Sequence, residues 1–177
     1  NWSGSGRLLY TIYTSPYVDG LSIFNNNITC PTANQYLVLL RRMSNVLIQN
    51  NIFTVESLCV HNEECYQLTI SNNELRLSGS TYPPFNCSNA NMVTIDNNRI
   101  VMTANSAENF VNITGTSNTF TIRNNTATHV FASICTPPTV CHLAYNQLTT
   151  ANAGDTILTS KLQITNTTDA STSTGSI

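Results

Sequence analysis

An asparagine pair follows a short apolar strand five times along the chain, and its spacing constrains the fold more than any other feature. Measured between the first asparagines, the successive intervals are 25, 22, 25, 27, 22 and 20 residues when two weaker copies are included. A period in the twenties predicts a solenoid, in which each repeat forms one coil. The copies are LSIFNNNI from Leu21, VLIQNNIF from Val46, LTISNNEL from Leu68, VTIDNNRI from Val93 and FTIRNNTA from Phe120, with HLAYNQLT from His142 and KLQITNTT from Lys161 as the weaker ones.

Apolar residues alternate with polar ones on both sides of each pair, and the parity of the alternation changes across it. In VTIDNNRIVM, Val93 and Ile95 stand four and two residues before Asn97, whereas Ile100 and Met102 stand three and five after it. Such alternation is typical of strands with one buried face. One extra residue lets the chain bend while both strands keep their apolar faces inward, and asparagine tolerates the left-handed backbone of a tight bend.

Each repeat is therefore predicted as strand, asparagine bend, strand and variable connection, which is typical of a parallel β-helix. We expect an all-β, parallel β-helix solenoid of about six to seven coils over residues 21–166. The first asparagine of each repeat continues the inward parity, which predicts a buried ladder of amides whose hydrogen bonds each contribute about 1 kcal/mol. Its predicted members are Asn25, Asn50, Asn72, Asn97, Asn124, Asn146 and Asn166.

An antiparallel β-sandwich with hairpin turns at the asparagine pairs is the alternative fold. Such turns favour Asn-Gly or Asp-Gly, and none of the five pairs has this sequence. The parallel β-helix is therefore the preferred prediction.

The repeat pattern resembles that of the right-handed β-helix proteins grouped with the pectin lyases. The copies VLIQNNIF and LTISNNEL are more closely similar to the β-helical repeats of the dispersed-gene-family surface glycoproteins of trypanosomatid protozoa. The resemblance covers about residues 21–166. It implies a surface-exposed, glycosylated module without enzymatic activity, and it assigns no site residues.

Composition favours a secreted or cell-surface protein. Only 9% of the residues are charged, the net charge is -2, and asparagine makes up about one residue in seven, so a basic nucleic-acid footprint is absent. The longest apolar run, YLVLL at residues 36–40, is too short to span a membrane. An even number of cysteines, six, accompanies six acceptor sites for N-linked glycans, which are Asn1, Asn27, Asn86, Asn112, Asn124 and Asn166.

The cysteines are predicted to form disulfides in the variable connections. Two cysteine pairs have five intervening residues each, in CVHNEEC and CTPPTVC, and both segments precede a repeat by a few positions. This equal spacing favours the local bridges Cys59–Cys65 and Cys135–Cys141, which leaves Cys30 to pair with Cys87. The alternative pairs Cys30–Cys59 and Cys65–Cys87 would join neighbouring coils. The spacing is wrong for zinc, and no pair of histidines accompanies it.

The two ends differ from the repeats. Residues 1–20 are predicted to form a cap or a strand that pairs with another molecule, and the polar Ser/Thr-rich residues 167–177 an extended tail or linker. A solenoid without caps presents open strand edges, which favour end-to-end self-association.

No catalytic constellation, metal site or cofactor site is evident in the sequence. Glu74 and Asp96 flank asparagine pairs on adjacent repeats, but solvated outward positions are the simpler interpretation, and a glycosidase needs two precisely spaced carboxylates. Arg76, Arg99 and Arg123 fall near the bends and are also interpreted as outward residues. His61, His129 and His142 are widely separated along the chain.

The sequence thus favours a non-enzymatic extracellular structural or adhesive glycoprotein, which either stacks end to end into a filament or presents an adhesive surface to a cell-surface or carbohydrate partner. The alternative is a protein that binds or cleaves a polysaccharide along a groove of the β-helix.

Overall fold

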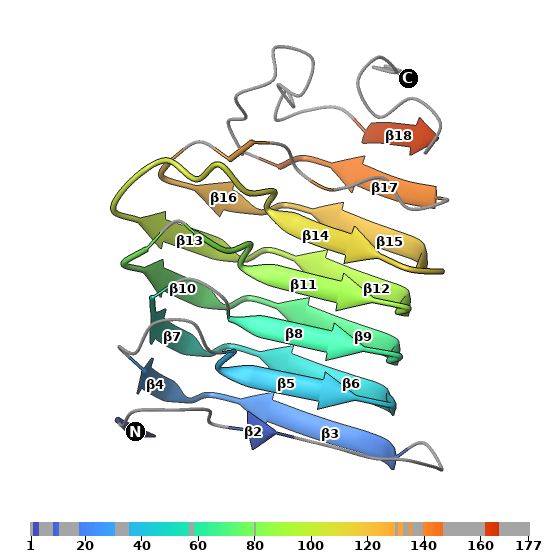
Figure 1. The fold of residues 1–177 in the computed structure, drawn as a ribbon, viewed down its shortest axis with the longest axis horizontal. Coiled ribbons are helices and arrows are strands. Elements are labelled where there is room, and N and C mark those ends of the chain that lie inside the picture. Colours follow the sequence, from blue (N-terminus) through green and yellow to red (C-terminus); the bar gives the residue numbers. More distant parts are fainter. Residues whose placement is uncertain are drawn as a thin grey trace.

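The computed structural model is a β-solenoid built from three parallel sheets (Figure 1). It describes residues 2–3, 9–10, 18–30, 36–56, 59–79, 81–129, 131–132, 135, 140–146 and 162–166. From β1 to β17, strands that follow one another in the described part of the chain belong to different sheets, and each pairs in parallel with its counterpart one turn away. This parallel pairing identifies the β-solenoid and rules out the antiparallel sandwich.

The first sheet has six strands, in the order of the chain. They are β1 (Trp2–Ser3), β4 (Asn27–Cys30), β7 (Ile52–Val55), β10 (Glu74–Leu77), β13 (Arg99–Met102) and β16 (Thr126–Ala127). The second sheet has five strands, which are β2 (Leu9–Tyr10), β5 (Val38–Arg41), β8 (Val60–Glu63), β11 (Phe85–Ser88) and β14 (Val111–Thr114).

The third sheet has seven strands and contains the apolar strand of each repeat. They are β3 (Val18–Phe24), β6 (Met43–Gln49), β9 (Tyr66–Ser71), β12 (Asn91–Asp96), β15 (Asn118–Arg123), β17 (Val140–Ala144) and β18 (Leu162–Asn166). All of them pair in parallel except β18, which runs antiparallel to β17.

The solenoid has about four turns, so the prediction of six to seven coils is wrong. Counting asparagine motifs counts strands of the third sheet, whereas a turn needs a strand in each of the three sheets. The turns are β5–β7, β8–β10, β11–β13 and β14–β16. At one end β2–β4 add a turn whose strand in the second sheet has two described residues, and at the other the antiparallel β18 ends the parallel stacking of the third sheet.

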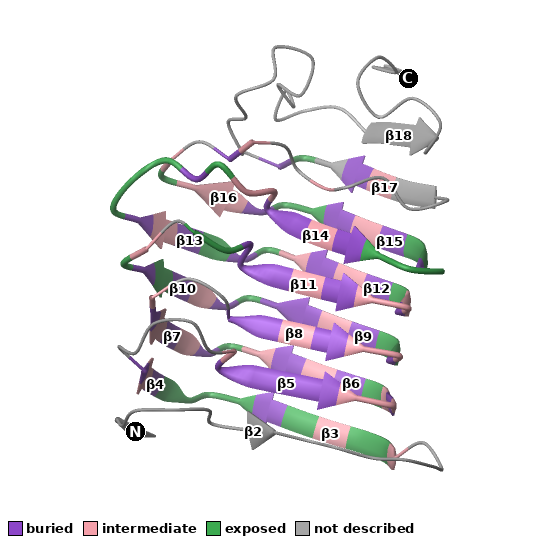
Figure 2. Cartoon of the chain, in the orientation of Figure 1, coloured by how far each residue is buried: buried purple, intermediate pink, exposed green. Residues whose placement is uncertain are grey.

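The core lies between the three sheets and consists of stacked columns of like residues. Buried and less buried positions alternate along most strands, as Figure 2 shows. Toward its C-terminal end the core contains three aromatic rings in edge-to-face contact, with the ring centroids of Phe85 and Phe110 5.3 Å apart and those of Phe110 and Phe131 5.5 Å apart. The column of the third sheet is Ile23, Ile48, Ile70, Ile95, Ile122 and Leu143.

Left-handed backbone occurs in three columns, not only at the asparagine bends. Thirteen described residues other than glycine have φ between 51° and 57°. The bend column contains Asn25, Asn50, Asn72, Asn97, Asn124 and Tyr145. The kink column, whose members are skipped in the register of the third sheet, contains Asn45, Gln67, Met92 and Thr119, and the corner column before that sheet contains Arg42, Glu64 and Asn89.

Candidate functional site

A ladder of asparagine amides is present, but in the five asparagine pairs its member is the second asparagine and not the first, which is the one predicted from the sequence. In each rung an Nδ2 donates to the Oδ1 of the next turn at 2.9–3.1 Å, and the backbone N–H of the same asparagine donates to that oxygen at 2.9–3.0 Å. Each Nδ2 also donates to a backbone carbonyl, so the interior amides are satisfied on both sides. The ladder starts at the exposed Asn26 and continues through the buried Asn51, Asn73, Asn98, Asn125 and Asn146.

The left-handed residue of each bend explains the displacement. Asn25, Asn50, Asn72, Asn97 and Asn124 use their positive φ to turn the chain, and their side chains are exposed or partly exposed. The residue that follows the bend then points inward. Asn146 was predicted correctly because Tyr145 occupies the bend position before it, and the side chain of Asn166 lies outside the described residues.

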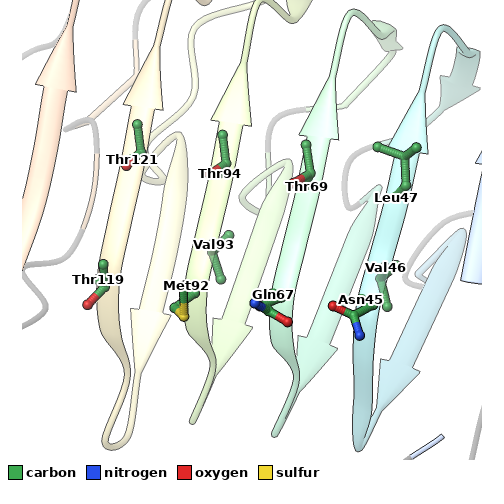
Figure 3. Close-up of a pocket in the computed structure, with 10 residues that line it drawn as sticks. All are labelled: Asn45, Val46, Leu47, Gln67, Thr69, Met92, Val93, Thr94, Thr119 and Thr121. Atoms are coloured by element: carbon green, nitrogen blue, oxygen red, sulfur yellow. The ribbon is translucent and has the colours of Figure 1, made fainter. Parts of the chain in front are cut away.

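A polar groove runs across the outer face of the third sheet and is the candidate binding surface. One row of its side chains comes from the middle of four successive strands, and the other from the kink column beside them (Figure 3). The groove has a volume of about 500 Å³. The first row is Leu47, Thr69, Thr94 and Thr121, which are register partners, and the second is Asn45, Gln67, Met92 and Thr119.

The groove itself carries no ionisable group among its ten described lining residues. Charged residues border it, and among them Asp19 on β3 accepts hydrogen bonds from the lining residue Asn45 and from Ser44. At one end of the strands Arg123 contacts Asp96 at 2.9 Å, and in the corner before the other end Arg42 contacts Glu64 at 2.5 Å. The described lining therefore offers hydroxyl and amide groups together with a comparable apolar surface, and no general acid or base.

The acidic residues considered from the sequence lie outside the groove. Glu74 is on the first sheet, where it contacts Arg76 at 2.6 Å and Arg99 at 3.0 Å. The Arg76 hydrogen bond is the main reason that the pKa of Glu74 lies below its usual value, which is the opposite of what a general acid requires. Asp96 belongs to the third sheet and contacts Arg123, so the structure does not bring Glu74 and Asp96 together as a pair.

The predicted local disulfide between Cys59 and Cys65 is incompatible with the fold. The intervening residues are not a loop but the extended strand β8, so the two cysteines lie at opposite ends of a strand. At about 3.3 Å per residue they are separated by far more than the roughly 7 Å that a disulfide allows between Cα atoms.

Cys59, Cys65 and Cys87 are buried free thiols, so neither set of predicted bridges is formed among these three. Burial raises the pKa of the Cys59 thiol and raises that of Cys87 to about 12. These groups are therefore protonated core residues rather than nucleophiles. The predicted partner of Cys135, Cys141, has a side chain outside the described residues.

The glycan acceptor sites that the structure describes lie on different faces. Asn27 is exposed on β4 of the first sheet, and Asn124 is exposed in the bend column, where its Nδ2 donates to Oδ1 of Asp96 at 2.8 Å. Asn86 and Asn112 are register partners on β11 and β14 of the second sheet. Asn1 and the side chain of Asn166 lie outside the described residues.

The groove was missed from the sequence, although a signal for it exists. The motifs LTI, VTI and FTI place a threonine between two buried residues in three successive repeats. The alternation therefore predicts an outward threonine row. The kink column has no such signal, because its members differ in type from turn to turn.

Comparison of the chain with protein-family models, with curated proteins and with solved structures finds no match. The parallel β-solenoid is confirmed, whereas the resemblance to trypanosomatid surface glycoproteins has no support from these comparisons.

None of the segments that the structure describes is a helix with the length and apolar character needed to cross a bilayer. Within the same residues, no three His, Cys, Asp or Glu side chains converge as a metal site.

Proposed function

We propose that this chain is a non-enzymatic extracellular glycoprotein, a stiff module that presents the groove of the third sheet as an adhesive surface. The observation that carries the proposal is an uncharged groove extending over four successive strands of a face that is braced from inside by the amide ladder. Such a face keeps its shape when it is exposed, and binding requires no reordering of its backbone.

The groove chemistry favours an uncharged, extended ligand, for which a neutral polysaccharide is the natural class. Threonine hydroxyls and the Gln67 amide can exchange hydrogen bonds with sugar hydroxyls, while Met92 and Leu47 offer apolar contact. An acidic polysaccharide would need cations in the lining. The alternative function, cleavage, would need a carboxylate pair within about 5–10 Å of the scissile bond, and no carboxylate belongs to the described lining.

The test is retention of the secreted chain on immobilised neutral and acidic polysaccharides. We expect binding to at least one neutral polymer and a large loss of binding for Thr94→Arg, which places a long cation in the middle of the groove. The matched control is Thr54→Arg, an outward threonine of similar burial on β7 of the first sheet, which should bind as the wild type does. Equal binding by both variants, or release of reducing sugar from any polymer, would contradict the proposal.

End-to-end assembly is a second proposed property of the same module. It is supported by β3, the terminal strand of the third sheet, which has seven residues and carries Phe24 with 57% of its surface exposed. A long terminal strand is a template for pairing with another chain. Negative-stain microscopy is expected to reveal rods of several units, and Phe24→Lys should shorten them. Single units at high concentration would contradict the assembly and leave the groove proposal intact.

A further inference from the structure

Two glycan acceptor sites lie directly above one another on the second sheet. Asn86 on β11 and Asn112 on β14 are register partners with outward side chains, and adjacent strands are about 4.8 Å apart. The Nδ2 of Asn112 donates to Oδ1 of Asn86 at 3.0 Å, and the Nδ2 of Asn86 lies 3.2 Å from Nδ1 of His61. The two acceptor nitrogens therefore belong to one short outer amide row.

A hollow of about 390 Å³ lies over this row. Asn86 and Asn112 contribute to its lining, together with Tyr36, Thr81, Tyr82, Pro83 and Glu108. Tyr36 is fixed by an edge contact with His61, with ring centroids 4.4 Å apart, and Tyr82 is 41% exposed. The volume is near the lower end of the range of small-ligand sites, and the aromatic walls suit the C–H faces of a sugar ring.

We infer that the second sheet carries a single N-linked glycan, seated in this hollow, and that Asn86 and Asn112 are alternative acceptors for it. The inference rests on the proposed extracellular function. It goes beyond that function because it selects among the acceptor sites and assigns a ligand to the hollow.

The chemistry of the attachment explains why one glycan is compatible with the fold. Transfer from a lipid-diphosphate oligosaccharide forms a bond between Nδ2 and sugar C1, breaks the bond from C1 to the phosphate oxygen, and releases the lipid diphosphate and one proton. The modified amide keeps one N–H. Asn112 can therefore carry a sugar and still donate to Asn86, or Asn86 can carry the sugar and still accept from Asn112.

Two glycans are not compatible with the same geometry. Their first sugar rings would start from register partners on adjacent strands and would compete for the one hollow that both residues line. Because transfer takes place on the unfolded chain, the structure acts at the folding stage. A chain with both sugars has to place two sugar rings on side chains whose amides folding brings to 3.0 Å.

Asn27 supplies the internal control. Its side chain is exposed on β4, and its register partner on β7 is Ile52, which is not an acceptor. A glycan on Asn27 therefore meets no acceptor on β7 and reports whether the chain is glycosylated at all.

The test is intact-mass analysis and glycopeptide mapping of the folded protein secreted from a eukaryotic cell, with variants Asn86→Gln, Asn112→Gln and the double variant. We expect one glycan on the pair in the wild type, one in each single variant, and none in the double variant. Glycans on both residues of one molecule, or on neither while Asn27 is modified, would overturn this inference alone. A secreted chain without any glycan would overturn it together with the proposed glycoprotein.

A second measurement tests the seat in the hollow. Glycan removal by an amidase from the folded protein should be several-fold slower at the Asn86–Asn112 pair than at Asn27. Tyr82→Ala should remove this protection, whereas Tyr66→Ala, which deletes a similarly exposed tyrosine from the third sheet, should not. Equal rates at the pair and at Asn27 in the wild type would show that the sugar lies free in solvent.

Discussion

Asn73 and Asn62 lie in the same turn of the solenoid, are both buried, and have opposite hydrogen-bonding environments. Asn73 accepts two hydrogen bonds from Asn51 and donates to Asn98 and to the Ile48 carbonyl. Asn62 donates only to Sγ of Cys87, at 2.8 Å, and its Oδ1 has no partner. The register partners of Asn62 are Leu40 and Cys87, not asparagines. A buried amide is thus favourable where the repeat supplies the same amide above and below it, and unfavourable where it does not.

The largest expected effect is in the ladder. Asn98→Leu should lower the free energy of unfolding by about 4 kcal/mol, because it removes the acceptor for two N–H donors of Asn73 and the donor to both Asn125 and the Ile70 carbonyl. Chemical denaturation measures the difference. A loss below about 1 kcal/mol would mean that the ladder contributes little beyond its shape.

The opposite sign is expected outside the ladder. Asn62→Leu should raise the free energy of unfolding by about 1 kcal/mol, because it replaces a buried amide with an unpaired oxygen by the residue type found at Leu40 in the same column. The same denaturation experiment applies. Destabilisation comparable to that of Asn98→Leu would remove the distinction between the two sites.

A smaller effect separates the bend from the ladder beside it. Asn97→Leu should cost about 1 kcal/mol, because Asn97 has φ 52°, where leucine is strained, and because its Nδ2 donates to Asn72 near the surface. The thermal midpoint should fall much less than for Asn98→Leu. Equal losses at the two positions would indicate that bend and ladder act as a single unit.

Thr119 allows the cost of positive φ to be measured at an exposed position, where side-chain burial does not contribute. It has φ 56° in the kink column, which is a costly conformation for a β-branched residue. Thr119→Asn should therefore raise the free energy of unfolding by about 0.5–1 kcal/mol, measured by denaturation. Any loss of stability would mean that the threonine hydroxyl makes a compensating interaction.

The smallest expected effect concerns the exposed charges of the first sheet. The pKa of Glu74 is lowered in the folded state, so its contribution to stability is present above the usual carboxyl pKa and is lost as pH falls through the lowered value. Glu74→Gln should slightly lower stability at pH 7 and make it less sensitive to acid. Because Glu74 and its two arginines lie at the surface, the change should be small and should weaken further with added salt.

The sequence predicted the parallel solenoid because one signal repeats in phase with the structure. The isoleucine column and the asparagine pair occur in every full repeat, so spacing and parity identify the strand and the bend. Parity alone placed the ladder one residue early. A residue with positive φ reverses the inward–outward alternation, and the sequence does not indicate which asparagine of each pair adopts that conformation.

Other features were not predictable by the same means. The kink and corner columns contain Gln67, Met92, Thr119, Arg42 and Glu64, whose intrinsic preferences disfavour positive φ. There the stacking of successive turns overrides local propensity. The segment CVHNEEC was interpreted as a loop because its cysteines have the same spacing as those of CTPPTVC, which suggested a local bridge. In the structure it contains a strand, in which Val60 and Asn62 point inward and alternate with less buried residues.

The amide ladder also gives the molecule an electrical direction along its axis. From Asn26 to Asn125 each side-chain amide donates one N–H to the next turn on the C-terminal side, and from Asn51 to Asn146 each side-chain carbonyl accepts from the turn on the N-terminal side. The amide dipoles therefore add along the column, just as peptide dipoles add along an α-helix, and do not cancel. Two such columns placed with like ends together repel, whereas placed head to tail they attract. Any linear array of these units is thus biased to run in one sense.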